Sequence, residues 1–163
     1  RQFEESRMSR AVVALDTGRA AYLDAAEFEL AVSCAASVAI QTLYSESPLA
    51  LLTTRDTLRT VTPTRALDEL SLVEQTTRGG IQDLVHTTLR REPGASVAVV
   101  ITGSSATMAD LRQACSRFDV DTRVVGIRVD LDGDLRARSA GHITVLQVGD
   151  LTELPRAMRK AMQ

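Results

Sequence analysis

The chain is poor in several residue types on which common binding chemistries depend. Lysine occurs once, as Lys160, so 18 of the 19 Lys and Arg residues are arginines. No lysine therefore lies in a loop after a predicted strand, which excludes Walker-type phosphate binding and Schiff-base chemistry. The two cysteines, Cys34 and Cys115, form no CxxC motif and no cluster with histidine, so they offer no zinc ligand set. We expect both to be reduced and partly buried.

Charge of one sign and long apolar runs are also lacking. The formal net charge is −2 without a basic patch, which does not indicate a nucleic-acid-binding protein. No uninterrupted apolar run approaches the ~20 residues that span a bilayer, so we expect this piece of chain to be soluble. The composition is 44% hydrophobic and 25% charged, close to that of an average folded domain. We therefore expect residues 1–163 to form a single domain and, since they begin at Arg1 rather than Met, to be a piece of a longer protein.

Two apolar runs end abruptly in small polar loops. The first run, 11–15, stops at Asp16, and the second, 96–102, opens into Gly103-Ser104. Continuous apolar runs are typical of strands that are covered on both faces. Parallel strands place their carboxyl ends at one edge of the sheet, where open α/β sheets bind their ligands. The sequence therefore predicts a candidate site at this edge.

The remaining pattern alternates helices and strands. Asp24 suits an N-cap, and Glu27 stands three residues later as in a capping box. Helices are predicted at 24–45, 63–72, 81–91, 107–118 and 151–162, and further strands at 49–54, 57–62, 120–129 and 143–148. Residues 1–9 are expected to form an edge strand that leads into 10–16. This order predicts an α/β, Rossmann-like three-layer sandwich, with a mainly parallel central sheet and one antiparallel edge strand.

The acidic segment 130–134 is the one stretch that imitates a calcium loop. An EF-hand needs glycine at its sixth position and glutamate at its twelfth. Counted from Asp130, Gly133 is fourth and Gly141 is twelfth. We therefore interpret the segment as an exposed Asp-Gly turn.

Four segments together resemble a known family. They are Val12–Ala20, the small-residue helix Glu27–Ser37, Thr77–Gly80 and Val99–Ser104. Their order and spacing over nearly the whole chain resemble a von Willebrand factor type A domain. More narrowly, they resemble the C-terminal domain of the bacterial domain-of-unknown-function family fifty-eight.

The resemblance implies a magnesium site at the sheet edge, but this chain departs from the family pattern. Type A domains use an Asp-x-Ser-x-Ser motif, a threonine in a later loop and a second aspartate. Asp16 matches the first aspartate, whereas Gly18 and Ala20 stand at the serine positions and lack side-chain oxygens. Thr77, or Thr76, matches the threonine. The position of the second aspartate falls near Gly103 or Ser104, and neither residue has a carboxylate. Because most of the oxygen ligands are missing, we expect no bound metal and no cofactor.

An arginine is a candidate replacement for the missing ion. Arg19 lies inside the motif, and Arg78 precedes Gly79 in the loop opposite. A guanidinium pairs well with a carboxylate, so one hypothesis places either side chain beside Asp16. The alternative is that both arginines point into solvent.

The leading functional hypothesis is a non-catalytic protein–protein interaction domain with a degenerate metal-ion-dependent adhesion site. The resemblance implies a MoxR-type AAA+ ATPase as partner, and a cytoplasmic domain of a membrane-anchored protein. The alternative is a phosphatase-like hydrolase of the haloacid-dehalogenase type with Asp16 as nucleophile, but Gly18 stands where that chemistry needs an acid. A third hypothesis is anion binding at the Gly79-Gly80 loop, assisted by Arg78.

Overall fold

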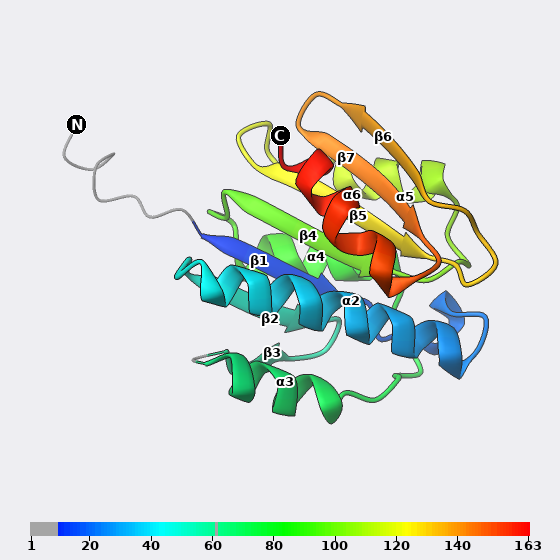
Figure 1. Cartoon of the computed structure of the whole chain (residues 1–163), viewed down its shortest axis with the longest axis horizontal. Coiled ribbons are helices and arrows are strands. Elements are labelled where there is room, and N and C mark those ends of the chain that lie inside the picture. The colour runs from blue at the N-terminus through cyan, green and yellow to red at the C-terminus, as the bar shows by residue number, and fades with distance from the viewer. Residues whose placement is uncertain (1–9, 61) are drawn as a thin grey trace.

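The computed structural model describes residues 10–60 and 62–163, which are organised around one seven-stranded sheet (Figure 1). The strands are β1 (Ala11–Leu15), β2 (Leu49–Thr53), β3 (Thr57–Leu58), β4 (Val97–Thr102), β5 (Arg123–Val129), β6 (Arg136–Ala140) and β7 (Ile143–Val148). Their order across the sheet is β3-β2-β1-β4-β5-β7-β6. The central strands are parallel, and β3 and β6 pair antiparallel at the two edges.

Helices cover both faces of the sheet (Figure 1). One face carries α2 (Ala25–Tyr44), α3 (Pro63–Ser71) and α6 (Leu154–Ala161), and the other carries α4 (Ile81–Arg91) and α5 (Met108–Cys115). Alternate residues of β1 serve the two layers: Val13 and Leu15 pack with α2, whereas Val12 and Ala14 pack with α4 and α5. This arrangement confirms the predicted three-layer sandwich with a mainly parallel sheet.

Helix α2 is the core helix of its layer. Asp24 is its N-cap, as predicted, because the side chain accepts the N–H of Glu27 at 3.0 Å. By length and composition α2 is also apolar enough to cross a membrane. The search for apolar runs in the sequence did not predict this, because Glu27, Glu29 and Gln41 interrupt the apolar residues of the helix. In the folded domain the helix buries Phe28, Ala31 and Cys34 against the sheet.

The elements that differ from prediction lie at the sheet edges. β6 was not predicted, because all its residues are exposed and show no apolar alternation. Its arginines keep an edge strand from pairing with another chain. β3 covers Thr57 and Leu58 of the strand predicted at 57–62. The edge strand expected at 1–9 lies outside the described residues.

The strand order places a topological switch between β1 and β4. From β1 the chain continues through α2 to β2 on one side, and it later reaches β4 on the other side. Open α/β sheets place their ligands at such a switch point. The candidate site predicted from the two apolar runs lies at this edge, where the loops that follow β1 and β4 meet through a hydrogen bond from the Ser105 N–H to the Ala21 carbonyl at 3.1 Å.

Candidate functional site

Asp16 is the centre of the site, and both oxygens of its carboxylate accept hydrogen bonds from within the chain. Oδ1 accepts the backbone N–H groups of Gly18 at 2.9 Å and Gly80 at 3.0 Å, and Oδ2 accepts the Thr102 hydroxyl at 2.7 Å. The phenol of Tyr22 donates to the backbone carbonyl of Asp16 at 2.6 Å. The Asp16 side chain has no exposed surface (0%). It therefore works as an internal acceptor that joins three segments far apart in the sequence.

Two glycines allow the loops to meet over this carboxylate. Gly18 forms a parallel bridge with Thr76, and Thr76 accepts the N–H of Arg19 at 2.8 Å. A Cβ on Gly79 would lie 2.5 Å from the Cα of Gly18, and a Cβ on Gly18 would lie 2.8 Å from the Cα of Gly79. A serine at position 18, as in the adhesion motif, therefore does not fit. The backbone of the 76–80 loop occupies the space that such a side chain would need.

A second buried carboxylate organises the neighbouring loop. Glu27 is 1% exposed, and it accepts the N–H and the hydroxyl of Ser104, both at 2.7 Å, and the N–H of Leu23 at 3.2 Å. The predicted capping box is therefore only half correct, because the Glu27 side chain does not return to Asp24. It instead fixes the loop after β4 against the start of α2.

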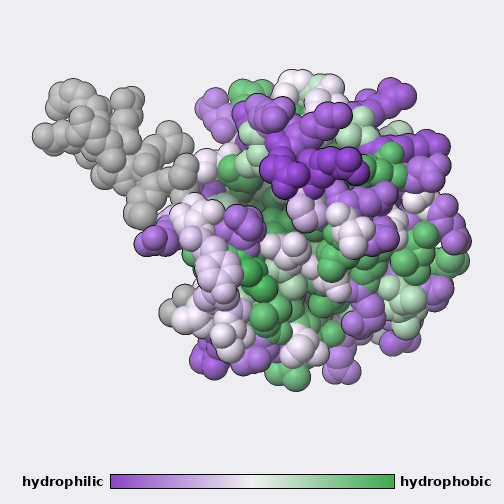
Figure 2. All heavy atoms as spheres, in the orientation of Figure 1, coloured by the Kyte–Doolittle hydropathy of each residue, from purple (hydrophilic) through white to green (hydrophobic). Residues whose placement is uncertain are grey.

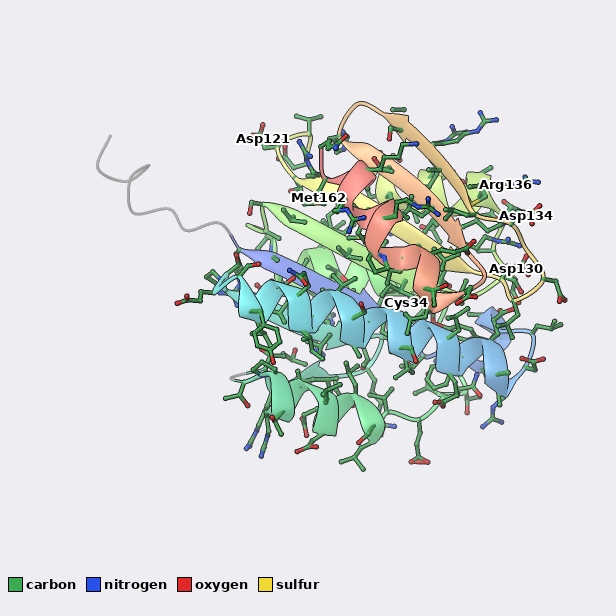
Figure 3. The ribbon with its side chains drawn as sticks, in the orientation of Figure 1. Cys34, Asp121, Asp130, Asp134, Arg136 and Met162 are labelled. Atoms are coloured by element: carbon green, nitrogen blue, oxygen red, sulfur yellow. The ribbon has the colours of Figure 1, made fainter. Side chains whose placement is uncertain are left out.

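Arg128, at the end of β5, ties the other half of the edge together. Its Nε donates to the carbonyl of Ala106 at 2.5 Å, and its Nη2 donates to the carbonyl of Ser104 at 2.8 Å. Its Nη1 donates to Gln147 at 2.6 Å and to Asp130 at 3.1 Å. Figure 3 places Asp130 in the loop that follows β5. Sequence reasoning missed this residue, although an arginine in an apolar strand was a usable signal.

Burial controls the ionisation of Asp16. Loss of water raises the pKa of its carboxyl above the ordinary 3.8, and the hydrogen bonds from Gly18, Thr102 and Gly80 lower it only in part. Burial, with the nearby charges of Asp16 and Glu27, raises the pKa of Tyr22 well above 10. Burial also raises the pKa of Cys34 and Cys115 to about 12. Both are free thiols, as predicted, but they are fully rather than partly buried.

This pKa predicts a pH dependence of stability. The folded pKa of Asp16 exceeds the unfolded value, so its contribution is complete below pH 3.8 and is lost as pH rises through the folded pKa. We expect the unfolding free energy of the wild type, relative to Asp16→Asn, to fall from about pH 4 upward. Urea unfolding of both proteins between pH 4 and 8 measures this difference, in which the other carboxylates cancel. A difference that stays constant or grows with pH would contradict it.

The structure brings most of the predicted site residues together and separates others. Asp16, Gly18, Gly79, Gly103 and Ser104 lie in the three loops described above. The exposed members of the predicted set are Arg19, Ala20, Thr77 and Arg78. The threonine that contacts the loop after β1 is Thr76 rather than Thr77. The hydroxyl of Thr76 lies 3.1 Å from that of Thr17.

The hypothesis that an arginine neutralises Asp16 is wrong. The ion pairs among residues 10–60 and 62–163 join Arg10 to Glu92 and Arg128 to Asp130. Arg19 and Arg78 are exposed instead. The physical reason is that the carboxylate is completely buried, with two backbone amides and one hydroxyl donating to it, whereas both guanidinium groups belong to exposed residues.

The backbone N–H of Gly80 and the residues around Asp16 also bear on the hypotheses of anion and metal binding. Gly80 is the N-cap of α4, and its N–H binds Asp16, so the anion at this helix start is the chain's own carboxylate. Mg²⁺ prefers an octahedron of hard oxygens. Asp16 is completely buried beneath its hydrogen-bond donors, and the residues at positions 18 and 20 supply no side-chain oxygen. The described part of the chain holds no group of three His, Cys, Asp or Glu side chains suited to a metal. The residues at this edge therefore do not fit the magnesium site of the adhesion motif.

Of the comparisons with known proteins, the one with solved structures identifies the fold. Neither family models nor curated sequences give a match. Among solved structures, the chain is similar to a von Willebrand factor type A protein from Catenulispora acidiphila, with a TM-score of 0.59 and 16% identity. The alignment covers 94% of this chain and 41% of that one, so this chain spans less than half of its neighbour. The protein thus has a fold of the von Willebrand factor type A class.

Proposed function

We propose that this chain is a non-catalytic protein-docking domain, and that its docking edge is an adhesion site that works without a metal ion. The observation that carries the proposal is the state of Asp16. Its two oxygens accept hydrogen bonds from Gly18, Gly80 and Thr102, where an ion-binding edge would need them for the cation. Hydrogen-bond donors of the chain itself therefore hold the loops of this edge together.

The surface above this carboxylate supplies the docking chemistry. We define the docking rim as the exposed residues Arg19, Ala20, Leu23, Thr77 and Arg78. Leu23 is 72% exposed, and neither arginine forms an ion pair within the described residues. An apolar side chain beside two free cations favours a partner that presents an acidic residue next to an apolar one.

The resemblance to the bacterial family fifty-eight supports a particular partner. On that basis we propose a MoxR-type AAA+ ATPase as the protein that docks on the rim. The same resemblance supports a longer, membrane-anchored protein in which this domain lies on the cytoplasmic side.

The haloacid-dehalogenase alternative receives less support from the site. A phosphoryl-transfer nucleophile must present a free carboxylate oxygen to the substrate. Asp16 is completely buried, and Gly18 lies against the backbone of Gly79 where a second acid would stand. The geometry therefore favours docking over catalysis by this aspartate.

The rim predicts the effect of charge reversal. We expect Arg19→Glu combined with Arg78→Glu to weaken binding of the MoxR-type ATPase more than tenfold, because both cations would become repulsive to an acidic partner surface. Surface plasmon resonance at two salt concentrations measures this change. Arg138→Glu, on the exposed edge strand β6, is the matched control and should bind as the wild type does. If the wild type, the double variant and Arg138→Glu bound the ATPase with equal affinity, the docking rim would not be part of the interface.

A further inference from the structure

A groove opens at the opposite end of the sheet from the docking rim. It has a volume of about 530 Å³ and lies between α2 and α6, over the first residues of β1 and β4. Figure 2 shows hydrophobic atoms in the hollow between these helices, and Figure 3 places Met162 at the end of α6. The volume falls within the 300–1,000 Å³ that is typical of small-molecule sites.

The walls of the groove change from apolar inside to polar outside. Val13 and Val99 are buried at its base, and Val97 and Met158 are half-buried nearer the opening. Hydroxyl and amide side chains of α2 and the following turn supply polar lining, namely Ser37, Gln41, Thr42, Ser45 and Ser47. An occupant would therefore bury an aliphatic body and leave a polar head at the mouth.

The charged residues of the lining all carry the same sign. They are Arg10 and Arg159, and neither aspartate nor glutamate is among the described lining residues. Arg10 pairs with Glu92 at 2.7 Å, whereas Arg159 forms no ion pair within the described part of the chain. Arg159 is thus a cation at the groove that is available to an anionic head.

From this geometry we propose that the groove binds a free, single-chain aliphatic carboxylate, with its chain on the valines and Met158 and its carboxylate at Arg159. The site is separate from the docking rim, so it does not depend on the proposed function. An unbranched chain suits a methionine-lined wall, because Met adapts to irregular apolar shapes.

Three probes test this proposal on the whole chain: octanoate, decanoate and uncharged octanamide. Each added CH₂ should tighten the dissociation constant about threefold to fourfold, so decanoate should bind about tenfold tighter than octanoate in calorimetry. Arg159→Gln should weaken octanoate about threefold and leave octanamide unchanged. Arg156→Gln, at an exposed position of α6 outside the lining, should change neither.

Amide NMR shifts locate the ligand, and a filling variant blocks it. Decanoate should shift the signals of Ser37, Val97 and Met158, and Ser37→Phe should abolish binding while the far-ultraviolet circular dichroism stays unchanged. The proposal is overturned by absence of decanoate binding at millimolar concentration, by shifts outside the groove, or by equal binding to Arg159→Gln and wild type. Shifts of the groove signals that depend on protein concentration without ligand would instead assign the groove to a second copy of the chain.

Discussion

Asp16→Ala is expected to lower the free energy of unfolding by about 3 kcal/mol. The substitution leaves the N–H groups of Gly18 and Gly80 and the hydroxyl of Thr102 without their acceptor in a buried site. Each unsatisfied buried donor costs about 1 kcal/mol or more. Chemical unfolding followed by circular dichroism at pH 7 measures the change.

Asp16→Asn is the control for this effect. The amide oxygen can accept the two backbone N–H groups, and the amide nitrogen can donate to the Thr102 hydroxyl. We therefore expect its stability to remain within about 1 kcal/mol of the wild type. If Asp16→Ala were as stable as Asp16→Asn, the carboxylate would not be the link that joins the three loops.

Gly79→Ala is expected to destabilise the domain by about 2 kcal/mol more than Gly80→Ala. Both glycines have positive φ angles, +156° and +128°, so both substitutions strain the backbone. Only the Cβ at position 79 meets another segment, 2.5 Å from the Cα of Gly18, whereas a Cβ at position 80 meets no atom within 4 Å. The difference between the two variants therefore measures the close approach of the loops.

Thermal and urea unfolding of the two alanine variants give this difference directly. Strain from φ alone would make the two variants equally unstable. That result would mean that the 76–80 loop can move away from Gly18 at little cost in free energy. A serine side chain would then also fit at position 18.

The parts of the site that follow from local patterns could be predicted from the sequence. Strands β1 and β4 are buried on both faces, so each left a continuous apolar run, and the first polar residue after β1 marked Asp16. The N-cap at Asp24 was likewise a local signal, because its partner Glu27 is three residues away.

The partners of Asp16 depend on tertiary structure and were not predictable in the same way. Thr102 lies opposite Asp16 because Leu15 pairs with Ile101 one residue earlier. The two apolar runs in the sequence do not determine this register. Gly80 reaches Asp16 across 64 residues only after the loop has closed.

Local reading also misassigned side chains that have a choice of partners. Glu27 fitted a capping box, but Ser104, 77 residues away, offers two donors to the same carboxylate. Arg128 was not singled out in the sequence, because its partner Gln147 comes beside it only when β7 pairs with β5. In both cases the tertiary partner determined the role of the side chain.

Thermal unfolding with and without Mg²⁺ is the most direct test of a docking edge that has no ion. A ligand that binds only the folded state raises the melting temperature by mass action. We expect 10 mM MgCl₂ to shift the melting temperature by less than about 1 °C relative to NaCl of equal ionic strength. A rise of several degrees that disappears in Asp16→Asn would contradict it, because a cation would then be bound at the carboxylate that we assign to Gly18, Gly80 and Thr102.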